Sequence, residues 1–158
     1  MNSTFKDVNG KEWDLKITLG GARRALDNLG IDLLNPASKT KDGEILSSKL
    51  MSDDLFLYTV VLCLIEPQLE KAGLDTDDES IDELFDAESL RGMDSAFWSE
   101  YKNFFTVRGK AWAAKAIEAD LKARSEALTK ALEELEASDG GTSSEPSDAQ
   151  ASADAGNA

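Results

Sequence analysis

A glycine pair followed by two arginines has the residue types of a phosphate-binding turn. Residues 15–36 read LKITLGGARRALDNLGIDLLNP, where an apolar run leads into Gly20-Gly21 and then Arg23-Arg24. A dinucleotide fingerprint needs G-x-G-x-x-G after a buried strand, and a Walker A loop needs G-x-x-x-x-G-K-[ST]. Because neither pattern is present, we interpret the glycines as the start of a helix. Arg23 and Arg24 are then expected to be surface or intersubunit residues.

Carboxylates between residues 75 and 86 have the spacing of a calcium-binding loop. The side chains that follow the EF-hand ligand count are Asp75, Asp77, Glu79, Glu83 and Asp86. Ser80 stands where that loop needs glycine, and Asp86 is shorter than the usual bidentate glutamate. A capping box over residues 76–79 explains the same side chains without calcium, so we expect no bound metal.

Residues for the common nucleophilic mechanisms are missing. The chain has no histidine and a single cysteine, Cys63, which excludes the usual zinc ligand sets and the Ser-His-Asp and Cys-His arrangements. We therefore expect no cofactor and no enzymatic activity. Cys63 lies in an apolar run and requires no oxidising compartment, and the polar start of the sequence predicts no signal peptide. These features favour a reducing cytoplasm.

The negative charge is concentrated in one segment. Residues 66–100 contain twelve acidic side chains against two basic ones, and they account for −10 of the formal net charge of −14. Such a surface repels nucleic acid and anionic membranes and favours basic protein partners. The longest apolar stretch, residues 55–65, is shorter than the roughly 20 residues that span a bilayer. We expect neither a nucleic acid nor a membrane as partner.

The first residues predict a β-hairpin. In FKDVNGKEWDLKIT, Asn9-Gly10 is typical of a two-residue type I′ turn. Trp13, Leu15 and Ile17 alternate with polar residues, which indicates one apolar face. A lone two-stranded hairpin is marginal in water, so this face is expected to pack on helices.

The rest of the chain predicts helices with a period of about 3.6 residues. The expected segments are 18–29, 53–66, a short helix opened by the capping box from Thr76 to Glu79, 95–105 and 108–137. Thr18 and Gly30 are expected to cap the first helix. Ser52 is expected to cap the second, which Pro67 kinks or ends. In the last of these segments, Ile117, Leu121, Leu128, Leu132 and Leu135 form an apolar seam that Arg124 interrupts.

The fold prediction is therefore mostly α. An N-terminal β-hairpin packs on a bundle of about five helices, of which the last is long. Residues 1–137 form a single domain. Residues 138–158 contain small and acidic residues without a large apolar side chain, and they predict a disordered acidic tail.

Aromatic side chains are concentrated in SAFWSEYKNFF, residues 95–105. At helical spacing most of them should belong to the core, but such a dense group could leave two or three at an interface. Trp112 follows closely in the next predicted helix.

The order of these signals resembles the small tail assembly chaperones of long-tailed, siphovirus-like bacteriophages and prophages. The resemblance covers roughly residues 5–130 and rests on ARRALDNLGIDLLNP, on DDLFLYTVVLCLIEPQLEKAGL and on the acidic segment leading to SAFWSEYKNFF. It implies a non-catalytic protein of the host cell cytoplasm that binds the tape measure protein, helps recruit tail tube protein, and is absent from the finished virion. It also implies, in many members, a longer frameshifted product.

Under this resemblance, the candidate client contacts are Trp98, Tyr101, Phe105 and Trp112, and self-association to a homo-oligomer stays open. Two other classes remain as alternatives. The acidic segment is also compatible with an inhibitor that mimics nucleic acid, and a small helical protein is compatible with a minor structural tail or connector protein.

Overall fold

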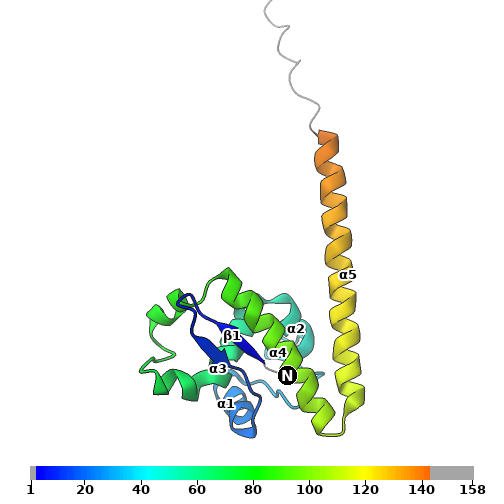
Figure 1. Cartoon of the computed structure of the whole chain (residues 1–158). Helices are drawn as coiled ribbons and strands as arrows, with labels where there is room; N and C mark the ends of the chain where they lie inside the picture. The colour runs from blue at the N-terminus through cyan, green and yellow to red at the C-terminus, as the bar shows by residue number, and fades with distance from the viewer. Residues whose placement is uncertain (1–2, 143–158) are drawn as a thin grey trace, which may run out of the picture. The chain divides into compact units, whose positions relative to one another are not determined.

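The computed structural model describes residues 3–142, with side chains through residue 138, and this part of the chain is mostly α-helical (Figure 1). Its elements are β1 (Thr4–Lys6), β2 (Glu12–Asp14), α1 (Leu19–Leu29), α2 (Leu46–Ser52), α3 (Asp54–Lys71), the 3₁₀ helix η1 (Glu79–Leu84), α4 (Ala87–Val107) and α5 (Ala111–Thr142). The predicted fold class, with its N-terminal hairpin and long last helix, is confirmed.

Two compact units divide the chain, Met1–Glu118 and Ala119–Ala158. The predicted single domain over residues 1–137 therefore differs from this division, which falls within α5. The change of composition at Ser138 does not end the helix, because α5 continues to Thr142. The rest of the predicted disordered tail, residues 143–158, lies outside the described residues.

The hairpin turn differs from the prediction. Phe5 lies opposite Trp13, and the Asp7 N–H donates to the Lys11 carbonyl at 3.0 Å, so residues 8–10 form the loop. Gly10, with φ of 81°, donates its N–H to the Asp7 carbonyl. The Asp7 carboxylate accepts the N–H groups of Asn9 and Lys11 and the Trp13 indole N–H. These bonds favour a three-residue loop over the two-residue type I′ turn.

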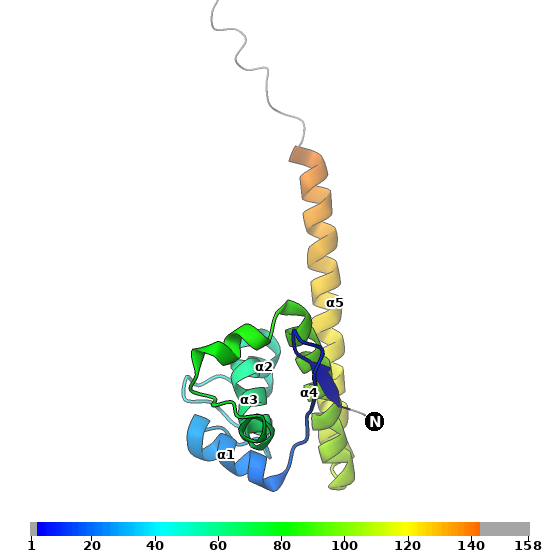
Figure 2. The same ribbon diagram turned by 60° about the vertical axis from the view of Figure 1, so that its left-hand side comes forward.

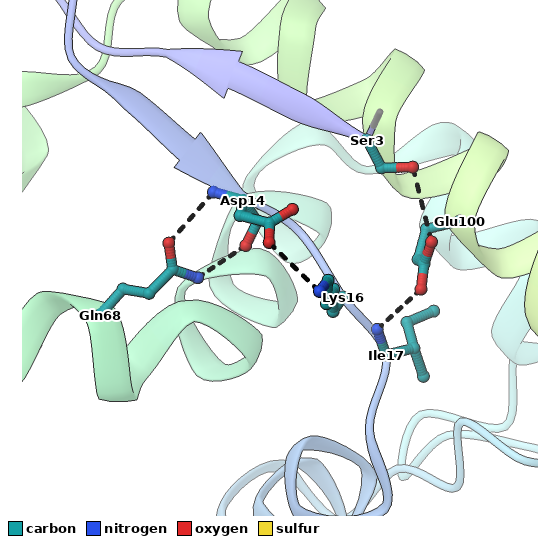
Figure 3. A network of polar contacts seen from close by, with 6 residues as sticks. All are labelled: Ser3, Asp14, Lys16, Ile17, Gln68 and Glu100. Atoms are coloured by element: carbon teal, nitrogen blue, oxygen red, sulfur yellow. Dashed lines mark hydrogen bonds and ion pairs between the residues drawn. The ribbon is translucent and has the colours of Figure 1, made fainter. Parts of the chain in front are cut away.

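Two helices supply side chains that bind residues at the ends of the hairpin strands (Figure 3). Gln68 of α3 accepts the Asp14 N–H at 3.0 Å and donates to the Asp14 carbonyl at 2.6 Å. Glu100 of α4 accepts the Ile17 N–H at 3.2 Å and the Ser3 hydroxyl at 3.5 Å. An isolated two-stranded hairpin is only marginally stable in water. These bonds to α3 and α4 add stability that a third strand would otherwise provide.

Local signals correctly predicted both ends of α1. The Thr18 hydroxyl accepts the Gly21 N–H at 3.0 Å, and Gly30 ends the helix with φ of 68°. Gly21 has a second role, since a Cβ atom there would lie 2.9 Å from Cδ2 of Leu64. The glycine thus allows α1 to approach α3 closely, and Figure 2 shows the two helices in the same part of the first unit.

Helix α3 does not end at Pro67 but continues to Lys71. Proline lacks an N–H, so the Cys63 carbonyl loses the donor that residue 67 of an α-helix normally supplies. Arg24 of α1 replaces it: Nε donates to the Cys63 carbonyl at 3.1 Å, and Nη2 donates to the Leu64 carbonyl at 3.2 Å. Glu66 lies 3.6 Å from the same Nε. Arg24 therefore supplies the hydrogen bond donor that Pro67 lacks.

Several helix starts also differ from the prediction. Ser52 ends α2, a helix that the sequence analysis missed, and Asp53 caps α3 by accepting the Phe56 N–H. Asp78 caps η1, so the capping box at Thr76 is wrong. Helix α4 begins at Ala87, before the predicted Ser95, because Asp86 accepts the Ser89 N–H.

Replacement of Arg24 tests whether its guanidinium substitutes for the missing N–H of Pro67. We expect Arg24→Ala to lower the free energy of unfolding by about 2–3 kcal/mol, because it leaves a partly buried carbonyl without a donor. In a Pro67→Ala background, which restores the helical N–H, the same change should cost about 1 kcal/mol less. Urea denaturation of the four variants measures both costs, and Arg23→Ala is the matched control. Equal costs in the two backgrounds would contradict the proposed role of Arg24.

Candidate functional site

Three of the four predicted client contacts are core residues. Trp98, Tyr101 and Phe105 are 4%, 0% and 1% exposed. The Tyr101 hydroxyl donates to the Leu33 carbonyl at 2.7 Å, and its ring lies 5.1 Å from that of Phe105. Neighbouring elements thus cover the aromatic side of α4, and the prediction that these three side chains meet a partner is wrong. Trp112, 71% exposed, stays available as a contact.

The two arginines have different surroundings. Arg24, expected to be a surface or intersubunit residue, is half-buried and its guanidinium binds the α3 backbone within the same chain. Arg23 is exposed and remains a surface residue.

An apolar hollow lies among α3, η1 and the start of α4. It has a volume of about 330 Å³. Its lining residues are Asp54, Leu55, Tyr58, Asp82, Phe85, Asp86, Ala87, Leu90 and Met93. We call this site the acidic-rimmed hollow, because its only charged lining residues are three aspartates. Leu55 is 75% exposed there, so its apolar side chain is accessible at the edge of the hollow.

Aromatic contacts fix the floor of the hollow. The ring centroids of Tyr58 and Phe85 are 5.9 Å apart in an edge-on arrangement. The Phe85 ring also lies 5.9 Å from Phe5 and 6.2 Å from Trp13, so the floor continues into the hairpin core. The Tyr58 hydroxyl donates to Asp82 at 2.8 Å, which joins α3 to η1. The hollow is therefore assembled from segments far apart in the sequence.

The rim is negatively charged. Burial and the bond to Asp82 raise the pKa of Tyr58, so its hydroxyl stays protonated at neutral pH. The backbone N–H and the hydroxyl of Ser89 lower the pKa of Asp86, which keeps that carboxyl ionised. An apolar floor with an anionic rim can hold an apolar side chain whose neighbours are lysine or arginine.

The sequence analysis missed Leu55, Tyr58 and Phe85. Leu55 and Tyr58 belong to the apolar run of residues 55–65, which Asp53-Asp54 precede directly. Such an acidic pair before an apolar run signals that the first turn of the helix reaches the surface. Phe85 gave no comparable signal, because its position depends on how η1 packs on α3.

Many of the acidic residues have local structural roles. Asp75, Asp78 and Asp86 accept backbone N–H groups of Asp77, Ser80 and Ser89 at 2.9–3.0 Å. Among the described residues there is no cluster of three or more potential metal ligands of the His, Cys, Asp or Glu type. Two of the five residues with calcium-like spacing, Asp75 and Asp86, thus have a turn or helix-cap role.

Cys63 lines a second hollow, between α1 and α3, with a volume of about 400 Å³. Burial raises the pKa of its thiol, so the thiolate needed for nucleophilic attack is disfavoured at neutral pH. Over residues 3–142, none of the helices has the length and apolar character needed to cross a membrane.

The two tyrosines predict a pH dependence. Burial raises the pKa of both Tyr58 and Tyr101 above the usual value of about 10. The unfolded chain then releases these protons first, so the stability they add is complete below about pH 10 and falls as the pH rises further. At that pH, near-ultraviolet absorbance should show half-ionised tyrosines in urea and almost none in the native protein. Tyr58→Phe should halve the unfolded signal. A native tyrosine that ionises at its ordinary pKa would contradict this prediction.

Comparisons with known proteins found no relative of this chain. No family model, no curated protein and no solved structure matches the chain.

Proposed function

We propose that the protein is a phage tail assembly chaperone that binds apolar helical segments of the tape measure protein in the acidic-rimmed hollow. The observation that carries this proposal is an apolar surface with Leu55 at its edge and Tyr58 and Phe85 beneath, bordered by carboxylates. A protein that holds apolar clients must expose apolar surface and still stay in solution, and an anionic rim serves both needs. The sequence resemblance supports the same function.

The size of the hollow favours transient binding. One buried leucine or phenylalanine contributes about 1.5–3 kcal/mol, and an exposed ion pair at the rim adds at most about 1 kcal/mol. A single anchor of this kind gives weak, rapidly reversible binding. Such an anchor releases its client when tail tube subunits compete for the tape measure protein, as assembly in the host cytoplasm requires.

The predicted client has a definite chemistry. Its helix presents a leucine, methionine or phenylalanine toward Phe85, with lysine or arginine one turn away facing Asp54 or Asp82. Exposed Trp112 is a second candidate contact in the same unit. The proposed chaperone is not an enzyme and is not retained in the finished virion.

Leu55→Glu tests the site. Leu55 is so exposed that the change should leave the fold intact, while a fourth carboxylate and the lost apolar edge should abolish client binding. Leu19→Glu is the matched control, since Leu19 is 72% exposed and does not line the hollow. We expect the tape measure protein, co-expressed from the phage that encodes this chain, to stay in solution with the wild type and Leu19→Glu but to aggregate with Leu55→Glu. Light scattering should show aggregated tape measure protein only with Leu55→Glu.

Other outcomes would support the alternatives. Salt-sensitive inhibition of a nuclease without any binding of tape measure segments would replace the chaperone by a nucleic acid mimic. Detection of the polypeptide in purified virions by mass spectrometry would indicate a structural tail or connector protein. A slippery heptamer near the codons for residues 130–158, followed by a long helix-rich gene, would support the chaperone independently of the hollow.

A further inference from the structure

A row of leucines lies along α5 in the second unit. The members of this leucine row are Leu121, Leu128, Leu132 and Leu135. Leu128, Leu132 and Leu135 are 55%, 60% and 60% exposed. With Ser125, their spacing of three and four residues places them on one side of the helix. A row with this period is the pattern by which one helix packs against another.

The charges beside the row differ between its two ends. Lys122 directly follows the first leucine, and Glu136 directly follows the last, so the two side chains flank the row on the same side. Both are exposed. Glu133 and Glu134 add to the negative charge of the second end. The row therefore has a cationic side chain at its start and an anionic border at its end.

We propose that the leucine row binds a second copy of this chain, with the two α5 helices antiparallel. In this arrangement Leu128 and Leu132 of the two copies meet at the centre. Lys122 of each copy lies beside Glu136 of the second copy, and symmetry gives this pair twice. Parallel helices would instead place the acidic ends together, which is unfavourable. Charge complementarity thus selects both the partner and its direction.

Self-association also adds to the proposed chaperone function without depending on it. A dimer carries two acidic-rimmed hollows, so a client with two apolar segments gains affinity through linkage of weak sites. The two proposals fail separately. Leu55→Glu should leave the dimer intact, and disruption of the leucine row should leave each hollow unchanged.

Sedimentation equilibrium of the full chain tests the interface. We expect a dimer, and we expect Leu128→Glu to raise its dissociation constant by about a hundredfold or more, because a carboxylate enters the centre from both copies. Ala123→Glu is the matched control, with the same new charge on the same helix but off the row. Circular dichroism confirms that both variants remain helical. A monomer at all concentrations, or a dimer that tolerates Leu128→Glu, would overturn the proposal.

Cross-linking tests the direction. Leu121→Cys and Leu135→Cys are made separately in a Cys63→Ala background and treated with a short bismaleimide. In antiparallel helices, the two copies of either cysteine are about 20 Å apart along the axis, since 14 residues separate the positions. We therefore expect cross-links only when the two variants are mixed. Cross-linking of each variant with itself would indicate parallel helices and contradict the proposal.

Charge exchange gives a second test of direction. Lys122→Glu alone and Glu136→Lys alone should each weaken the dimer by about three- to tenfold, because the lost pair occurs twice. The double variant should restore the wild-type dissociation constant. If the effects of the two changes simply add, the two side chains are not neighbours and the antiparallel arrangement is wrong.

Discussion

The bond between the Arg24 guanidinium and the α3 backbone is the interaction on which the first unit depends. Pro67 removes a hydrogen bond donor near the C-terminal end of α3, and an arginine from another helix replaces it. Gly21, three residues earlier, lets the two helices approach closely enough for this contact. Gly21 and Arg24, from the segment that first suggested an anion site, therefore serve the carbonyl groups of a neighbouring helix.

Helix α3 contributes to different sites at its two ends. The last turn carries Gln68, whose amide binds both backbone groups of Asp14 and holds the hairpin. The first turns carry Leu55 and Tyr58, which form part of the acidic-rimmed hollow. A single helix thus links the hairpin, α1 and the candidate client site. Its integrity determines the geometry of all three.

Features with local causes were predictable from the sequence. Thr18 and Gly30 cap α1 through groups within a few residues, and the long α5 follows from uninterrupted helical propensity. Features that depend on remote residues were not predictable. The sequence around Pro67 gives no sign of a donor on α1, and burial of Tyr101 depends in part on the Leu33 segment that accepts its hydroxyl.

In the candidate site, too, only features with local causes were predictable from the sequence. Its acidic border was predictable as composition, but its apolar floor requires the packing of η1 on α3. Helix α2 was missed because Ser52 was read as the cap of the following helix, whereas it is the last residue of α2 and Asp53 is the cap of α3.

The Phe85 side chain is part of both the acidic-rimmed hollow and the hairpin core. Its ring forms the floor of the hollow and also contacts Phe5 and Trp13 of the hairpin. Any molecule that rests on this ring adds its binding free energy to the cost of opening the hairpin. Occupancy of the hollow and protection of the hairpin amides from hydrogen exchange are therefore thermodynamically linked. Through Phe85, the rate of hydrogen exchange in the N-terminal strands therefore depends on whether the hollow is occupied.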